Sequence, residues 1–188
     1  MKIIGLVGAI GSGKSTVATC LTNYAYRRVR FSAPLKNMFR GLGLGYEHIE
    51  GNLKEEPCDL LSGFTPRYCM QTLGTEWARN IIDENFWTNI WIKEANKYPR
   101  VVAEDCRFPN EALAIRSLGG EIWLIKREGF SCEGHSSETE MAGINPDKII
   151  LNNSSIEILD RFIGRALAGY PNETDNNDIS GDILWPKK

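Results

Sequence analysis

A glycine-rich segment near the start of the chain restricts its possible folds more than any other feature. Residues 8–15 read Gly-Ala-Ile-Gly-Ser-Gly-Lys-Ser and follow the apolar residues 3–7. This is the complete pattern G-x-x-x-x-G-K-[ST], placed between a strand pattern and a helix pattern as in phosphate-binding loops. Glycines let backbone N–H groups wrap a polyphosphate, and the positive end of the following helix faces the anion. We therefore expect a nucleoside triphosphate with Mg²⁺ as the ligand.

Two side chains of the loop have roles that follow from their chemistry. The Lys14 ammonium can reach the β- and γ-phosphates, and the Ser15 hydroxyl can bind Mg²⁺. The alternative is a glycine-rich turn that contains Lys-Ser by chance, and the flanking strand and helix patterns argue against it. The loop residues expected to bind ATP are Gly11, Ser12, Gly13, Lys14, Ser15 and Thr16.

The composition and the net charge are typical of a globular domain. A chain of 188 residues can bury about 70% of the surface that its unfolded form exposes. The net charge of −2 argues against polymeric DNA or RNA as the main partner. Lys14 interrupts the apolar N-terminal stretch, which argues against a signal peptide, and no run is long enough for a membrane span. We expect a cytoplasmic protein without a membrane partner.

The five cysteines are scattered along the chain and do not resemble a disulfide framework. An intracellular ATP-binding protein keeps its thiols reduced. Cys132 and His135 have a spacing that suits two zinc ligands, but no second ligand pair follows them. We interpret all five cysteines as ordinary thiols.

Strand patterns alternate with helix patterns, which predicts an α/β protein with a parallel sheet that has helices on both faces. The expected strands are residues 2–7, 28–31, 100–103, 121–126 and 148–151. Beyond the helix after the phosphate loop, we expect one opened by Thr65 and Pro66, one over 86–96, one between Pro109 and Gly119, and one from Ser154 or Ser155 to Leu167.

Three segments depart from this alternation. Residues 41–63 are glycine-rich and polar, which predicts a mobile insertion between helices. Residues 128–145 are charged, carry three glycines and stand between two strands, where a phosphotransferase would have a lid. Residues 172–188 are acidic and contain few apolar side chains, which predicts a loosely held tail. We expect one domain over 1–169 and a tail over 170–188.

An acid and a base follow the third expected strand. Asp105 and Arg107 are two residues apart, so both lie on one side of the pleat if the strand continues. In doubly wound sheets this end of a strand faces the ligand crevice. The carboxylate can hold Mg²⁺ and the guanidinium can neutralise phosphate oxygens. The alternative is a surface ion pair at a strand end.

Further stretches resemble a known family. They are Phe-Ser-Ala-Pro-Leu-Lys at 31–36, Thr-Pro-Arg at 65–67, Gln-Thr-Leu-Gly-Thr-Glu-Trp-Ala-Arg at 71–79, Asp-Cys-Arg-Phe-Pro-Asn-Glu-Ala at 105–112 and His-Ser-Ser-Glu at 135–138. With the phosphate loop, these stretches resemble the bacteriophage deoxynucleoside monophosphate kinases, a branch of the P-loop nucleoside monophosphate kinases, over residues 1 to about 165. The most specific of them is 71–79, because it has no generic structural reason to recur.

The resemblance implies the P-loop NTPase fold, with a five-stranded parallel sheet flanked by helices, and it also implies a reaction and a layout. ATP would give its γ-phosphoryl group to a deoxynucleoside 5′-monophosphate, with Mg²⁺, to supply DNA precursors in phage replication. A region binding the nucleoside monophosphate (NMP) would occupy about 32–98, and a lid about 127–145. Asn152 and Asn153 lie where related kinases contact the ATP adenine, and Ser32 and Trp77 lie within the acceptor stretches. A phage-encoded enzyme would work in the host cytoplasm.

Cationic side chains are candidates for further roles, because the reaction must bring two anionic phosphates together. Lys14 and Arg127 are candidates for the transferring group, although Arg127 can also be read as a solvated surface charge. Arg67 suits bidentate phosphate binding, and Gln71, one helical turn later, can read a base edge or be a plain surface residue. The candidates for the acceptor phosphate are Lys36, Arg67 and Arg107.

Two other functions remain open from the sequence. One is a P-loop kinase of another small phosphate ester, such as a phosphomevalonate kinase, and the stretch 71–79 argues against it. The other is a non-catalytic nucleotide switch, which is disfavoured because no Asn-Lys-x-Asp motif is present. The accepted bases, the preference for deoxyribose and the choice between monomer and homodimer are left open.

Overall fold

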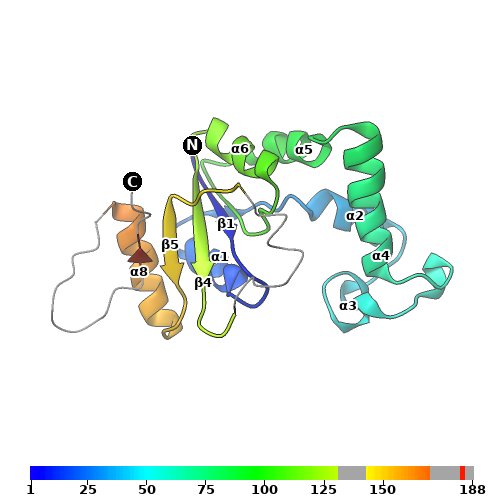
Figure 1. The fold of residues 1–188 in the computed structure, drawn as a ribbon, viewed down its shortest axis with the longest axis horizontal. Coiled ribbons are helices and arrows are strands. Elements are labelled where there is room, and N and C mark those ends of the chain that lie inside the picture. Colours follow the sequence, from blue (N-terminus) through cyan, green and yellow to red (C-terminus); the bar gives the residue numbers. More distant parts are fainter. Residues whose placement is uncertain (131–142, 170–182, 185–188) are drawn as a thin grey trace. The chain divides into compact units, whose positions relative to one another are not determined.

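The computed structural model describes residues 1–130, 143–169 and 183–184 (Figure 1). The chain divides into two compact units. The first comprises Met1–Arg30 and Glu94–Lys188, and the second comprises Phe31–Lys93. The lid expected over 127–145 therefore lies partly outside the described residues, and Cys132 and His135 lie wholly outside them, as does most of the tail.

The first unit is built on a sheet whose first five strands are all parallel. Its order is β2-β3-β1-β4-β5, which confirms the predicted five-stranded parallel sheet. The parallel strands are β1 (Lys2–Val7), β2 (Arg27–Arg28), β3 (Arg100–Ala103), β4 (Glu121–Lys126) and β5 (Lys148–Leu151). Every residue of β1 after Lys2 is buried, as expected for a strand covered on both faces.

Two strand predictions need correction. The second strand was expected over 28–31, but β2 contains only Arg27 and Arg28. The chain already turns toward a helix at Ser32, which has helical backbone angles. Val29 still donates a backbone hydrogen bond to Val102 at 3.0 Å. At the other edge, β6 (Ile183–Leu184) pairs antiparallel with β5, so the expectation of a loosely held tail is wrong for these two residues.

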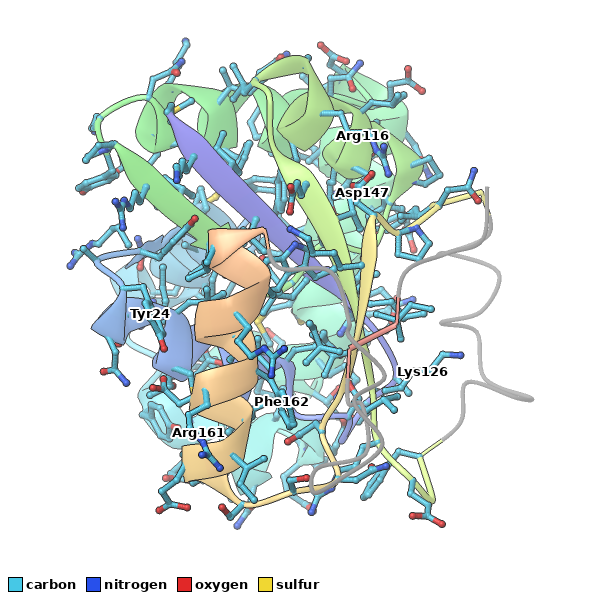
Figure 2. All side chains as sticks on the ribbon, turned by 90° about the vertical axis from the view of Figure 1, so that its left-hand side faces the viewer. Tyr24, Arg116, Lys126, Asp147, Arg161 and Phe162 are labelled. Carbon is cyan, nitrogen blue, oxygen red and sulfur yellow. The ribbon has the colours of Figure 1, made fainter. Side chains whose placement is uncertain are left out.

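Helices cover both faces of this sheet. On one face α1 (Lys14–Asn23) and α8 (Ile156–Ala168) enclose a core that includes Leu6, Trp123 and Phe162 (Figure 2). On the other face lies α6 (Pro109–Ser117), whose Ile115 fills the space beside Gly5 of β1. A Cβ on Gly5 would overlap that isoleucine, so the glycine permits close packing of helix and strand.

An ion pair and a side-chain cap fix the ends of two of these helices. Arg116 at the end of α6 pairs with Asp147 at 3.2 Å, and Asp147 also accepts the Ile122 N–H at 2.7 Å (Figure 2). The Ser155 hydroxyl accepts the Ile158 N–H at 3.5 Å, which confirms the expected start of α8. No helix among the described residues is both long and apolar enough to cross a membrane.

The second unit is helical. Its elements are α2 (Ala33–Gly41), α3 (Tyr46–Ile49), η1 (Asn52–Glu55), η2 (Asp59–Leu61), α4 (Pro66–Gln71), the π-helix η3 (Thr72–Ile82) and α5 (Phe86–Ala95), which ends in the first unit. Segment 41–63, expected as a mobile insertion, contains three short helices. Leu44 and Ile49 of this segment pack with Phe39 into a small separate core.

Two local predictions for this unit are confirmed. The Thr65 hydroxyl accepts the Tyr68 N–H at 3.2 Å, so Thr65 caps α4 with Pro66 in its first turn. Trp87 and Trp91, two of the apolar residues in the helix expected over 86–96, are both buried. The Trp87 indole donates to the Gly74 carbonyl at 2.8 Å and thereby joins α5 to η3.

Candidate active site

Four neighbouring strands end beside one another and carry most of the predicted donor-side residues. β3, β1, β4 and β5 are adjacent and parallel, so their carboxyl ends share one edge of the sheet. Asp105 follows β3, the phosphate loop follows β1, Arg127 follows β4 and Asn152 follows β5. The topology therefore brings these segments to the edge where parallel α/β sheets bind ligands.

The phosphate loop has the backbone that its glycines predict. Gly11 and Gly13 have φ values of 83° and 92°, in the left-handed region. Gly8 also has a positive φ, and a Cβ there would overlap the Ile125 carbonyl of β4. Gly13 precedes α1 without giving it a side-chain cap, so the first N–H groups of the helix are left for a ligand. Such a helix end attracts an anion.

Lys14 lies folded over the loop. Its ammonium donates to the carbonyl oxygens of Gly8 and Ala9 at 2.7 and 2.8 Å. Ser12 is fully buried, and within the described chain its hydroxyl has no hydrogen-bond partner. Neutral carbonyls are weaker partners for an ammonium than phosphate oxygens. The loop is thus arranged to exchange these contacts for contacts with a polyphosphate.

A buried carboxylate at the end of β3 was not predicted from the sequence. Glu104 is 5% exposed and accepts Arg28 Nη2 through both oxygens, at 2.5 and 2.6 Å. Arg30 Nε forms a second ion pair with Glu104. Arg28, Arg30 and Glu104 together carry a net charge of +1, and Asp105 is the next residue in the sequence. The cluster of basic residues near position 28 was the available signal, but the pairing depends on the alignment of β2 with β3.

The segment that carries Asp105 and Arg107 is held by Glu111. This carboxylate is buried in the first turn of α6 and accepts the N–H groups of Arg107 and Phe108 at 2.8 and 3.2 Å. Cys106 between the two candidates is buried. Burial, followed by the nearby negative charges of Glu111 and Asp105, raises the pKa of the Cys106 thiol well above its usual value.

The start of the expected lid is a tight turn that contacts the phosphate loop. Phe130 N donates to the Arg127 carbonyl at 3.1 Å, and Gly129 has the positive φ that the turn requires. The Arg127 guanidinium lies over the Phe130 ring, 5.3 Å from its centroid. A Cβ on Gly11 would overlap the same ring, so Phe130 packs on the loop. This contact, absent from the sequence-based prediction, places Arg127 beside the phosphate loop.

Cations also gather in the second unit. Lys36 pairs with Glu50 at 2.8 Å, and Arg67 pairs with Glu55. Lys54 is a further member that the sequence did not reveal. Burial, followed by the positive charges of Arg67 and Lys36, lowers the pKa of Lys54 below its usual value. Lys36, Lys54 and Arg67, which we call the cation cluster, therefore influence one another electrostatically.

The remaining acceptor candidates have separate positions. Gln71 is exposed at the end of α4, on the helix that also carries Arg67. Trp77 is 38% exposed, and its ring meets Phe86 edge-to-face with centroids 5.5 Å apart. The Ser32 carbonyl accepts the Lys36 N–H at 3.0 Å in the first turn of α2. These residues belong to the second unit, whereas Arg107 belongs to the first.

Comparison with known proteins identifies the family. A family model described as deoxynucleotide monophosphate kinase matches residues 45–163. A protein of Acanthamoeba polyphaga mimivirus, provisionally assigned as a deoxynucleotide monophosphate kinase, is 36% identical in an alignment 176 residues long, which covers 84% of this chain and 91% of that protein. The chain belongs to the deoxynucleotide monophosphate kinase family. It is therefore a kinase, a phosphotransferase that uses ATP.

Solved structures similar to the kinase are more distant. A Thermus thermophilus protein has a TM-score of 0.49 and 19% identity, with 90% of this chain and 98% of that chain covered. Dephospho-CoA kinase from Campylobacter jejuni has a TM-score of 0.45 and 17% identity, with coverage of 89% and 96%.

The donor set of the kinase fits the hard cation Mg²⁺. Ser15 is exposed in the first turn of α1, and Asp105 is half-buried after β3, so both offer oxygen ligands. Among the described residues, no group of three or more His, Cys, Asp and Glu side chains is arranged to hold a metal ion. A hydroxyl and a carboxylate suffice for an ion whose other ligands are phosphate oxygens and water.

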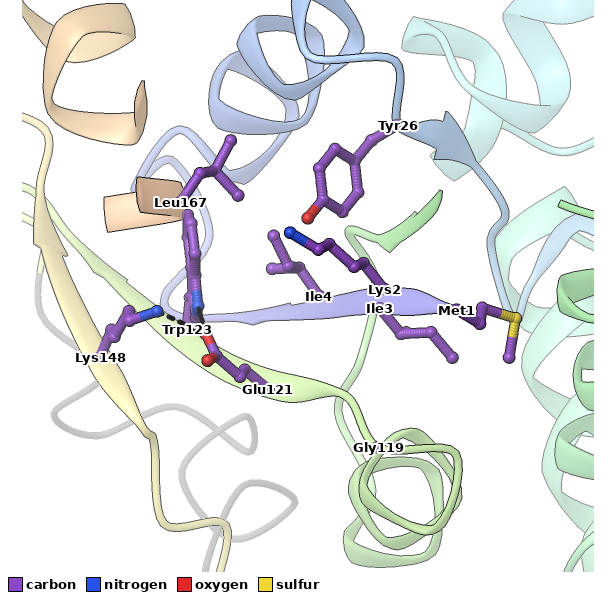
Figure 3. Close-up of a pocket in the computed structure, with 10 residues that line it drawn as sticks. All are labelled: Met1, Lys2, Ile3, Ile4, Tyr26, Gly119, Glu121, Trp123, Lys148 and Leu167. Atoms are coloured by element: carbon purple, nitrogen blue, oxygen red, sulfur yellow. Dashed lines mark hydrogen bonds and ion pairs between the residues drawn. The ribbon is translucent and has the colours of Figure 1, made fainter. Parts of the chain in front are cut away.

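A cavity of about 180 Å³ lies at the opposite edge of the sheet, near the amino ends of β1, β4 and β5 (Figure 3). Its wall includes Lys148, which donates to Glu121 at 2.6 Å and to the Ala166 carbonyl at 3.2 Å. Burial opposes ionisation of Glu121, but hydrogen bonds from Lys148 and Trp123 outweigh it and lower the pKa of the Glu121 carboxyl. None of the predicted site residues lines this cavity.

Proposed function

We propose that the kinase transfers the γ-phosphoryl group of Mg·ATP to a deoxynucleoside 5′-monophosphate, giving a deoxynucleoside diphosphate and ADP. The observation that carries the proposal is the phosphate loop of the first unit, whose glycine backbone and uncapped helix suit a triphosphate. The second unit separately contains the cation cluster, which suits a monophosphate. The family name and the viral relative support the same reaction.

On the donor side, the phosphate-loop residues and Thr16 bind ATP, and Asn152 contacts the loop through the Ser12 carbonyl. Lys14 and Arg127 stabilise the charge on the transferring phosphoryl group. Ser15 and Asp105 hold Mg²⁺, which neutralises phosphate charge when it is bound with the nucleotide. No general base is required, because the attacking oxygen of the acceptor phosphate is already ionised.

On the acceptor side, Lys36, Arg67 and Arg107 bind the phosphate of the monophosphate, and Lys54 joins them. In the free protein Glu50 and Glu55 neutralise Lys36 and Arg67. An incoming phosphate therefore competes with two carboxylates, which disfavours weakly charged anions. Gln71 reads the base, and Ser32 and Trp77 complete the acceptor site.

The layout and setting follow from the same proposal. Residues 1–169 form the kinase domain, with an NMP-binding region over about 32–98 and a lid over about 127–145. Residues 170–188 form a C-terminal tail. The enzyme would act as a monomer or homodimer in the cytoplasm of a phage-infected host and supply DNA precursors there, without binding polymeric nucleic acid or a membrane.

A coupled assay of ADP release tests the proposal. The kinase is mixed with Mg·ATP and each common deoxynucleoside and ribonucleoside monophosphate in turn, and the products are identified by chromatography. We expect ADP and the matching diphosphate to appear in equal amounts for at least one deoxynucleoside monophosphate. ADP release only with a different phosphate ester would contradict the proposed acceptor, and a nucleotide that binds without turnover would indicate a switch.

A further inference from the structure

We infer that Asn152, the residue directly after β5, is a positioning residue that holds the phosphate loop in its ligand-binding conformation. The inference deepens the proposed function and rests on it. Family resemblance suggested a contact between this position and the adenine of ATP, whereas the structure shows its side chain bonded to the loop itself.

Asn152 is fixed on both sides by backbone groups. It is 9% exposed, and its Nδ2 donates to the Ser12 carbonyl at 2.9 Å. Its own N–H donates to the Lys126 carbonyl at 2.7 Å, which ties the residue to the end of β4. The amide is therefore committed to one peptide group of the loop. The cost of leaving that buried donor unpaired would favour the same arrangement in every state of the site.

The contact also explains the glycine that precedes Lys14. Gly13 has a φ of 92°, and a Cβ on it would overlap the Asn152 amide. The asparagine thus occupies the space that the missing side chain leaves. Substitution at either position disturbs the same contact from opposite sides.

The geometry of one peptide bond links the Asn152 contact to ligand binding. The peptide bond between Ser12 and Gly13 is planar and trans, so the Ser12 carbonyl and the Gly13 N–H point in opposite directions. When Asn152 holds the carbonyl on its side, the N–H is directed away from Asn152. Backbone N–H groups of this loop are the donors that surround a polyphosphate. Asn152 therefore orients one of those donors without touching the ligand.

The neighbouring asparagine connects the same strand end to the lid turn. Asn153 Oδ1 accepts the Glu128 N–H at 2.8 Å, directly beside Arg127. The backbone after β5 is consequently joined to the phosphate loop through Asn152 and to the start of the lid through Asn153. Lys14 and Arg127 are the two cationic candidates for the transferring phosphoryl group. Lys14 lies two residues after Ser12, which Asn152 binds, and Arg127 directly precedes Glu128, which Asn153 binds.

The test separates a loop-positioning role from a base contact. Wild type, Asn152→Ala and the control Asn23→Ala are titrated calorimetrically with tripolyphosphate, ATP and adenosine, all with Mg²⁺. Asn23 is an exposed residue of α1 whose amide donates to Asp160 at 3.2 Å, so its variant also loses one side-chain hydrogen bond. We expect Asn152→Ala to weaken tripolyphosphate and ATP by the same factor, about 3- to 10-fold, and to leave adenosine unchanged.

A second comparison uses turnover. In Asn152→Ala, kcat should fall and KM for ATP should rise, while the ratio of ATP to GTP as donor and KM for the monophosphate stay as in wild type. Asn152→Ser, which is neutral and too short to reach the Ser12 carbonyl, should give the same pattern. Asn23→Ala should match wild type throughout.

Other results would overturn the inference. Wild-type affinity of Asn152→Ala for tripolyphosphate, or a loss shared by ATP and adenosine with an altered donor preference, would make Asn152 a base contact or a bystander. Failure of both Asn152 variants to fold would make it a structural anchor. If wild type bound neither tripolyphosphate nor ATP, the proposed function would fail as well, so the two failures are distinguishable.

Discussion

The Lys14 ammonium lies over two neutral carbonyls, and we expect that it moves to phosphate oxygens when ATP binds. Replacement by alanine removes a cation that stabilises the transition state. We expect Lys14→Ala to lower kcat by about 100- to 1,000-fold. The unfolding midpoint should change little, because the side chain covers the loop and takes no part in the core. Lys97→Ala, which removes an exposed lysine, is the control. Near-normal turnover in folded Lys14→Ala would contradict the donor-site assignment.

Asp105 can be tested without changing the size of the side chain. Asp105→Asn removes the negative charge that attracts Mg²⁺ directly or through water. We expect lower activity and a higher Mg²⁺ concentration for half-maximal rate, by about tenfold. The measurement is a Mg²⁺ titration at saturating ATP and acceptor, with Asp160→Asn in α8 as control. Identical titration curves for Asp105→Asn and wild type would leave Asp105 with a structural role only.

Lys54 gives a pH-dependent prediction. Burial and the charges of Arg67 and Lys36 lower its pKa, so it loses its proton at a lower pH than an ordinary lysine. Only the protonated ammonium attracts phosphate, and a bound phosphate would raise the pKa again. KM for the monophosphate should therefore rise as the pH increases toward the lowered pKa. Lys54→Met should raise KM by about tenfold at neutral pH and remove that alkaline rise. Parallel pH profiles for both proteins would exclude Lys54 from the acceptor site.

At the scale of the secondary-structure elements, the turn after β4 contacts the phosphate loop through one side chain. Phe130 packs on Gly11 and supports the Arg127 guanidinium. We expect Phe130→Ala to lower kcat several-fold, because Arg127 is then held less firmly over the phosphate loop. KM for the monophosphate should not change. Steady-state kinetics with each substrate varied in turn checks this, and Phe64→Ala, which removes an exposed ring of the second unit, is the control. A change confined to acceptor KM would contradict the assigned contact.

The same elements show which features local sequence predicts. Most strand and helix positions followed from apolar periodicity and from caps, Ser155 in the first unit and Thr65 in the second, which act within one turn of chain. The short β2, the edge strand β6 and the helices within 41–63 did not follow, because their formation depends on distant partners.

At the scale of the whole molecule, the donor candidates belong to the first unit and the acceptor candidates, except Arg107, belong to the second. The phosphate loop was predictable because one contiguous motif carries it, whereas the roles of Lys36 and Arg67 rest on charge and on a family resemblance and stay predictions. The sequence did not reveal Glu104, Lys54 or Phe130. Their importance lies in contacts between segments far apart in the chain, and no periodicity or motif records such contacts.

The central claim is that the second unit binds the acceptor while the first unit binds ATP. The most direct test measures kcat/KM of Arg67→Ala and Gln71→Ala for dTMP, dGMP, dCMP and dAMP at saturating ATP. Arg67→Ala should raise KM for every monophosphate alike. Gln71→Ala should change their ranking, by about 1 to 3 kcal/mol for a lost polar contact with the bound base. An unaltered ranking in Gln71→Ala, or an Arg67→Ala defect confined to ATP, would contradict the account.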